Sequence, residues 1–319
     1  IRRNRKNIIV DRDDIVLWRR HYLHKIRELR QQGSKIYYLD ETWINEGHTT
    51  AKAWCDKTIK SKKQAFLSGL SMGLRNPCGK GKQLIILHIG SDSGFVEDGE
   101  LVFESKKKGD YHEEMTGDVF RTWFEKIIPK LESNSIIVMD NASYHSVKSE
   151  LVPNKSWLKS NIKTWLQNKG IQYDDSFIKL ELLDLVTPLK SCYEKYVIDT
   201  MAETAGHCIL RLPPYHCCLN PIELVWSQVK GHVARHNTTF KLIDVRKIVD
   251  VAFREVTALK WRDCIEHVIK EENKMWELEG MIEKAVESFV ISLGDETDTS
   301  DNASAGTDSE GVQPVSESD

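Results

Sequence analysis

Two short apolar segments, each followed directly by an aspartate, constrain the fold of this chain more than any other feature. Residues 36–39 read Ile-Tyr-Tyr-Leu before Asp40, and residues 136–139 read Ile-Ile-Val-Met before Asp140. Continuous apolar runs of this length are typical of strands that are buried on both faces of a sheet. Between them, residues 117–131 repeat apolar side chains at helical spacing, which predicts an amphipathic crossover helix. Because strand, helix and strand in this order form a βαβ unit, we predict an α/β fold.

Further segments extend this unit into a mixed central sheet flanked by helices. Strands are predicted at residues 65–74, 83–89, 101–104 and 208–212, and helices at residues 12–32, 190–205 and from Asn220 to about residue 291. The segment from residue 151 to residue 189 interrupts this pattern with two short helical stretches around Gly170. We expect it to form a compact helical insertion, because it carries apolar residues of its own.

Charge divides the chain into a basic start, a near-neutral body and an acidic end. Residues 1–35 hold eleven Lys and Arg against four acidic residues, whereas residues 294–319 hold eight acidic residues and no basic one. The acidic end has few large apolar side chains, which predicts a disordered tail. A basic arm beside a near-neutral body suits a polyanion such as DNA, and a solvated basic helix remains the alternative.

No apolar run reaches membrane-spanning length, so we expect no membrane partner.

The two aspartates predict a metal site. Side chains at the ends of neighbouring strands can share an ion, because such strands lie about 4.8 Å apart. Carboxylates, together with water and phosphate oxygens, are the ligands that Mg²⁺ prefers. Two such ions, about 3.5–4 Å apart, can activate water and stabilise the leaving oxygen of a phosphodiester. His207, Cys208, His216, Cys217 and Cys218 lack the spacing of a zinc finger, so we do not expect zinc there.

A third carboxylate, Glu223, has two interpretations. Asn220-Pro221-Ile222-Glu223 has the residue order of a helix start in which Asn caps and Glu completes a capping box. On the same helix, however, Glu223 shares one flank with Lys230, an arrangement that suits a metal and then a phosphate. The tetrapeptide alone leaves both interpretations open.

Three blocks of sequence resemble the signature blocks of the Tc/mariner transposase superfamily over roughly residues 34–240. They are Leu39-Asp40-Glu41-Thr42-Trp43, Met139-Asp140-Asn141-Ala142-Ser143-Tyr144-His145, and the run from Leu212 to Trp226 that contains Asn-Pro-Ile-Glu. The resemblance implies a ribonuclease H-like fold, two Mg²⁺ or Mn²⁺ ions, and cleavage and joining of DNA strands. By position, Asp40, Asp140 and Glu223 match the catalytic acids and metal ligands.

The same resemblance implies a nuclear protein that acts on transposon ends and target DNA, with a homodimer as an open possibility.

Two features depart from the family pattern. First, 82 residues separate Asp140 from Glu223, and removing residues 151–189 leaves a more usual 43. Second, the family's N-terminal DNA-binding region has no counterpart, and residues 1–33 resemble the basic linker that would follow it. We therefore assign residues 34–270 to the catalytic domain, residues 271–293 to a C-terminal helix and residues 294–319 to the tail.

Several other residues have two interpretations each. His145 either contacts DNA or makes a hydrogen bond that fixes its loop. Glu41 points to the opposite strand face from Asp40, which favours a position at the surface or behind the metal ligands over metal ligation itself. Trp43 and Trp54 belong either to the core or to a DNA groove. DNA phosphate contacts are predicted for Lys230 and for the basic residues Arg2, Arg3, Arg5 and Lys6.

The insertion also has two interpretations. Residues 165–171 and 179–185 weakly resemble a SAP-like helix–extension–helix module, a small DNA-binding unit, and a plain helical flap is the alternative.

Two rival functions share this fold. One is a domesticated or decayed transposase that binds DNA without catalysis. The other is a ribonuclease H-like nuclease that acts on RNA, which the block around Glu223 disfavours.

Overall fold

The structure is a computed structural model that describes Val10 and residues 12–49, 81–105 and 115–294. The chain divides into two compact units, Ile1–Lys274 and Met275–Asp319, and the fold described below is that of the first. Three predicted features lie outside the described residues: the strand at residues 65–74, the basic residues 2–6 and the acidic tail from residue 295 onward.

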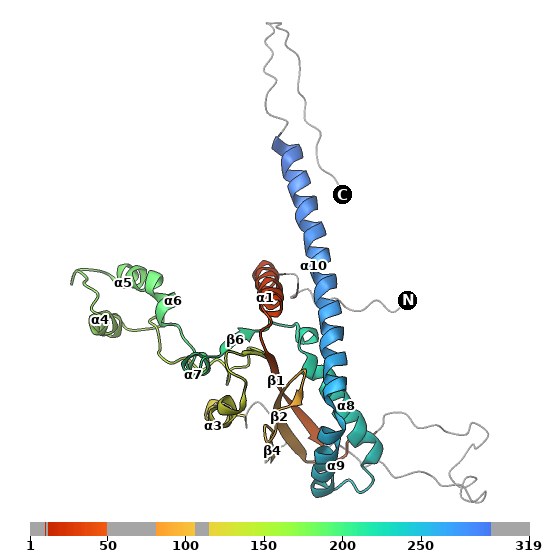
Figure 1. Ribbon diagram of the computed structural model, residues 1–319. Coiled ribbons are helices and arrows are strands. Elements are labelled where there is room, and N and C mark those ends of the chain that lie inside the picture. Colours follow the sequence, from red (N-terminus) through yellow and green to blue (C-terminus); the bar gives the residue numbers. More distant parts are fainter. Residues whose placement is uncertain (1–9, 11, 50–80, 106–114, 295–319) are drawn as a thin grey trace, which may run out of the picture. The chain divides into compact units, whose positions relative to one another are not determined.

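A six-stranded mixed sheet forms the centre of the first unit (Figure 1). Its strands are β1 (Ile36–Asn45), β2 (Gln83–Ser91), β3 (Gly94–Phe95), β4 (Leu101–Glu104), β5 (Ile136–Met139) and β6 (Cys208–Arg211). The order is β3-β2-β1-β5-β6, and β4 also pairs with β2. The strand β2 is antiparallel to β1, β3 and β4, whereas β1, β5 and β6 are parallel to one another. This topology, with helices on both faces, confirms the predicted α/β, ribonuclease H-like fold.

Strand β1 is longer than the sequence predicts. The expectation that it ends at Asp40 is wrong, because its antiparallel pairing with β2 continues from Tyr38 to Asn45. Its parallel pairing with β5, in contrast, covers only Ile36 to Tyr38. Asp40 therefore lies in the middle of a strand, at the point where the neighbour on one side has ended.

Different helices cover the two faces of the sheet. They are α1 (Asp13–Gln31), α3 (Gly117–Ile127), α7 (Val197–Thr204), α8 (Pro221–His236), α9 (Leu242–Glu255) and α10 (Ala258–Gly294). One face packs its odd-numbered β1 residues, such as Tyr37 and Leu39, against Phe120 and Phe124 of α3 and Ile198 of α7. Helix α8 contacts β1 and α9 contacts β2. The predicted domain boundary at residue 270 falls inside α10. None of the described helices is long and apolar enough to cross a membrane.

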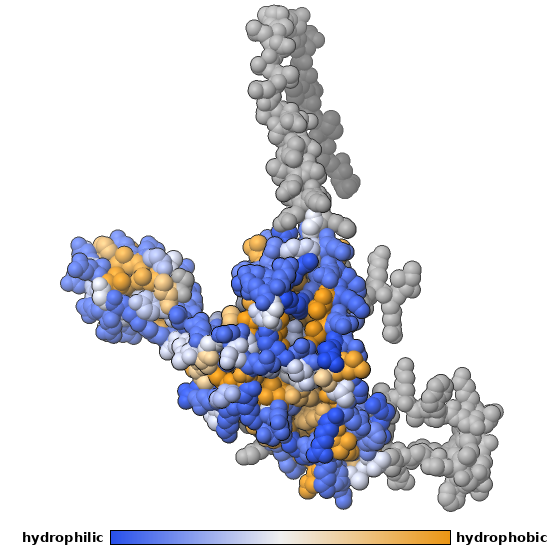
Figure 2. Space-filling view, in the orientation of Figure 1, coloured by the Kyte–Doolittle hydropathy of each residue, from blue (hydrophilic) through white to orange (hydrophobic). Residues whose placement is uncertain are grey.

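The predicted insertion forms two short helices with a core of their own. Helices α4 (Lys159–Asn168) and α5 (Lys179–Val186) are followed by the 3-10 turn Thr187–Leu189 and by α6 (Lys190–Tyr193). Six buried side chains form this core: Val152, Ile162, Trp165, Leu166, Leu182 and Val186. Tyr193 also packs against it, so the unit extends slightly beyond residue 189. Figure 2 shows an apolar area on the surface of this insertion. Leu158, Ile178 and Leu180 of the insertion have exposed side chains.

The two chain segments that enter and leave the insertion are joined to each other. Lys148 and Tyr196 form an antiparallel bridge, and the Ser149 amide donates to the Lys195 carbonyl at 2.9 Å. The chain therefore returns to its starting point before it continues into α7.

We predict that the insertion can be removed without loss of the fold. A short Gly/Ser linker in place of residues 151–193 joins ends that are already adjacent, and shortening a loop changes its closure entropy only slowly. Thermal unfolding should stay cooperative, with a Tm close to that of the full chain. As a control, Trp165→Ala should disrupt the core of the insertion alone. A shortened chain without cooperative unfolding would show that these residues belong to the central core.

Candidate functional site

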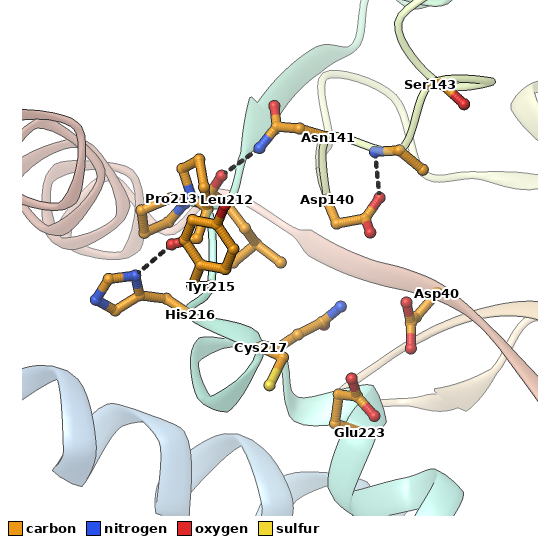
Figure 3. A pocket seen from close by; sticks show the side chains of 13 residues that line it. Asp40, Asp140, Asn141, Ser143, Leu212, Pro213, Tyr215, His216, Cys217 and Glu223 are labelled. Carbon is orange, nitrogen blue, oxygen red and sulfur yellow. Dashed lines mark hydrogen bonds between the residues drawn. The ribbon is translucent and has the colours of Figure 1, made fainter. Parts of the chain in front are cut away.

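Asp40, Asp140 and Glu223 line one pocket of about 450 Å³ (Figure 3). They come from three different elements: the middle of β1, the residue after β5 and the first turn of α8. Figure 3 shows the three side chains directed toward a common space. The wall is completed by two loop segments, residues 141–143 and residues 212–217, and by Asn220.

The start of α8 is attached to β1 through Asn220. The capping-box interpretation of Glu223 is wrong, because the Asn220 side chain makes no capping hydrogen bond. Instead, the Asn220 Nδ2 group donates to the carbonyl of Leu39 at 3.2 Å, one residue before Asp40. This contact brings the first turn of α8, and with it Glu223, beside the middle of β1.

Negative charge accumulates at Asp40. Burial raises the pKa of Asp40 well above its ordinary value, and the neighbouring carboxylates of Glu41, Glu223 and Asp140 raise it further. Desolvation by the pocket wall also raises the pKa of Glu223, which is opposed by the positive charge of Lys230. Carboxylates that repel one another in this way favour a bound cation, which would stabilise their charged forms.

The indole of Trp226 makes a direct contact with this group. Its Nε1–H donates to Asp40 Oδ2 at 3.1 Å, while the ring itself is buried. Sequence reasoning places Trp226 in the core, which is confirmed, but misses this polar contact. Trp226 follows Glu223 by three residues, so the two lie on neighbouring positions of the helix surface, but this spacing gives no signal of a contact with Asp40 in another element.

His145 is buried, so the prediction that it contacts DNA is wrong. The residue has no exposed surface, and its Nδ1 lies 2.7 Å from Asp140 Oδ1. Its Nε2 lies 3.0 Å from Glu41 Oε1. Burial alone would lower the pKa of His145, but the two carboxylates raise it to about 9. The alternative interpretation, a hydrogen bond that fixes the loop, is confirmed.

Lys230 lies beside the carboxylates and against an aromatic ring. Its Nζ is 4.9 Å from the centre of the Trp43 ring, and Trp43 is partly exposed at the surface rather than buried in the core. Burial lowers the pKa of Lys230, and the charges of Glu223 and Asp40 oppose that shift. Its predicted contact with a DNA phosphate stays a prediction. Arg2, Arg3, Arg5, Lys6 and Trp54 lie outside the described residues.

The pocket fits metal ions that are shared with a substrate better than an ion enclosed by protein. Among the described residues, no group of three His, Cys, Asp or Glu side chains is arranged to hold one ion. Mg²⁺, however, is usually bound by one or two carboxylates and completes its shell with water and phosphate oxygens. The Asn220 Oδ1 atom adds a buried oxygen acceptor without a hydrogen-bond partner to the same wall. Hard oxygen donors of this kind match Mg²⁺ or Mn²⁺.

Comparison with known proteins gives a family match over part of the chain. Residues 108–245 match the family model described as the DDE superfamily endonuclease. The matched segment contains Asp140 and Glu223, whereas Asp40 precedes it. No curated protein matches the chain.

Several solved structures of the Mos1 mariner transposase are similar to this chain. The Mos1 strand transfer complex has a TM-score of 0.49 and 13% identity, over 86% of this chain and 65% of that one. The Mos1 paired end complex with Mn has a TM-score of 0.48 and 13% identity, over 83% and 62%. The Mos1 catalytic domain with Raltegravir and Mg has a TM-score of 0.44 and 12% identity, over 83% and 94%. The chain thus spans less than two thirds of the first two transposase chains.

We predict that Asp40→Asn stabilises the metal-free protein at neutral pH. Because the folded-state pKa of Asp40 is raised, its stabilising contribution is complete below the unfolded-state pKa and is lost as the pH rises through the folded-state pKa. The variant should therefore melt at a higher Tm than the wild type at pH 7. The difference should disappear below about pH 4, the ordinary pKa of aspartate.

Asp199→Asn is the matched control. Asp199 accepts a hydrogen bond from Arg211 at 2.7 Å, so its neutral variant should melt at a lower Tm. Equal or lower stability of Asp40→Asn at pH 7 would contradict the proposed charge repulsion at Asp40.

Proposed function

We propose that this chain, whose residues 108–245 match the model of the DDE superfamily endonuclease, is the catalytic part of a Tc/mariner-type transposase that cleaves DNA strands. The observation that carries the proposal is the meeting of Asp40, Asp140 and Glu223 in one pocket. Strand β1, the loop after β5 and the helix α8 bring together the three acids that the sequence motifs indicate. Carboxylates that repel one another in a shared pocket are costly unless they bind cations.

In this proposal, Asp40, Asp140 and Glu223 hold two divalent ions, Mg²⁺ or Mn²⁺. Bound in this way, such ions would activate a water and stabilise the leaving oxygen of a phosphodiester. The Trp226 indole orients the Asp40 carboxylate, since it donates to Oδ2. In this proposal, the Oδ1 atom of Asp40 binds the ion. Lys230, on the same flank of α8 as Glu223, supplies positive charge next to the position of a scissile phosphate.

Further parts of the proposal concern partners and location. We propose DNA as the substrate, both at transposon ends and at the target, with joining of strands through a DNA 3′-hydroxyl. The basic character of residues 1–35 supports a polyanionic partner. Action on chromosomal DNA would require a nuclear location, and cutting two ends together would suit a homodimer.

We expect metal-dependent nicking of supercoiled plasmid DNA, and its loss in Asp140→Asn. Replacement of the carboxylate by an amide removes one charged ligand, so the nicking rate should fall by roughly 10³-fold or more. Asp175→Asn, in an exposed part of the insertion, should retain activity and serves as the control. Excess chelator should abolish nicking by the wild type. DNA binding without nicking in the presence of Mg²⁺ or Mn²⁺ would favour the decayed transposase instead.

We also expect Lys230→Ala to change the salt dependence of DNA binding. Loss of one phosphate contact should reduce the slope of log affinity against log salt concentration by about one. Binding is measured without divalent metal, so that the neighbouring carboxylates do not contribute through an ion. Lys126→Ala, on the exposed side of α3, should leave the slope unchanged and is the matched control. The same slope in wild type and Lys230→Ala would assign Lys230 to the solvated surface.

A further inference from the structure

We infer that Glu41 and His145, neither of which lines the pocket, form a buried chain that positions Asp140 for metal binding. The inference rests on the proposed metal site, and it assigns to these two residues a function in forming that site. The chain runs from Asp140 in the loop after β5, through the imidazole of His145, to Glu41 in β1.

The first link fixes the Asp140 carboxylate. Its Oδ1 atom accepts from the Ala142 amide at 3.0 Å and lies 2.7 Å from His145 Nδ1. Two donors on one oxygen, one from the backbone and one from a buried ring, define the rotation of the carboxylate about its last bond. About half of the Asp140 side chain is exposed, whereas the His145 ring that contacts it is fully buried.

The second link fixes the imidazole itself. His145 Nε2 lies 3.0 Å from Glu41 Oε1, and the Tyr144 hydroxyl donates to Glu41 Oε2 at 3.2 Å. Each ring nitrogen of His145 thus has a carboxylate oxygen within hydrogen-bond distance. The ring of Phe120, 4.2 Å away between centroids, packs against the imidazole, and Arg211 donates to the His145 carbonyl at 3.0 Å.

The burial of this chain indicates that it does more than stabilise the fold. Glu41 and His145 side chains are 2% and 0% exposed, and buried ion pairs are often no more stable than apolar side chains of the same volume. This hydrogen-bonded series connects β1 with the loop after β5, the two elements that supply Asp40 and Asp140, and so orients the Asp140 carboxylate. Glu41 and Asp40 are adjacent in β1 and face opposite sides, so the pocket is held from both faces of one strand.

Another buried histidine provides the comparison. His207, just before β6, is 6% exposed, and its Nδ1 lies 2.8 Å from Ser135 Oγ, just before β5. Among the described residues, no carboxylate forms an ion pair with His207, and burial lowers its pKa. It lies where β5 and β6 begin, whereas Asp140 follows the other end of β5, so replacing it tests the cost of losing a buried imidazole away from the pocket.

The test is a titration of metal-free protein with Mn²⁺, in which free Mn²⁺ is followed by electron paramagnetic resonance without DNA. Outer partners of metal ligands typically contribute 10- to 100-fold to affinity, so Glu41→Gln and His145→Gln should each weaken Mn²⁺ binding by about that factor. The double variant should bind no more weakly than His145→Gln, because Glu41 acts through the ring. His145→Asn, whose amide can replace Nδ1 toward Asp140, should bind more tightly than His145→Gln. His207→Gln should lower Tm and leave the Mn²⁺ affinity unchanged.

The outcomes separate the inference from the proposed function. A wild-type protein that does not bind Mn²⁺ would overturn the metal site and this inference with it. A wild type that binds Mn²⁺, together with variants of Glu41 and His145 that bind it equally well, would overturn the inference alone. If His145→Gln does not fold, the isosteric Glu41→Gln variant decides the question, since its side chain has the same size.

Discussion

The early end of the pairing between β1 and β5 is the constraint on which the site depends. The two strands pair in parallel only from Ile36 to Tyr38, while β1 continues to Asn45 along β2. One edge of β1 is therefore open from Asp40 onward, and α8 enters at this position. If β5 continued alongside β1, its backbone would fill the space that the three carboxylates share.

This opening requires that several acids lie close together, and the surrounding residues compensate for their repulsion in different ways. Trp226 and Asn220 approach from α8, where one donates to Asp40 and the other to the carbonyl before it. Lys230 adds a positive charge on the same helix. His145 approaches from the opposite side of the strand, from the loop that also carries Asp140. The second and third sequence blocks thus contribute both an acid and the groups that hold the acids in position.

The insertion shows why such a site tolerates a large addition to the chain. It enters and leaves through the paired residues Lys148 and Tyr196, and its helices bury their apolar side chains against one another. The elements before and after it, the Asp140 loop and α7, keep their places on the sheet. Asp140 and Glu223 therefore line the same pocket although 82 residues separate them in the sequence.

The sequence by itself determined the elements and the candidate acids. Apolar runs and helical periodicity depend on local composition, so β5, β6, α3, α8 and the two helices of the insertion could be predicted from them. The motifs around Asp40, Asp140 and Glu223 indicated the same three acids that line the pocket. Only the tertiary structure decided where β1 ends, because that depends on pairing with β2, whose partner residues lie 38 to 52 positions away in the chain. It also decided the functions of Asn220, Trp226 and His145, whose side-chain hydrogen bonds reach partners on other strands or helices. A capping asparagine, a core tryptophan and a DNA-contacting histidine were each consistent with local sequence. The direction of a polar atom is set by its three-dimensional neighbours, and these are not encoded in the spacing of residues along one helix or loop.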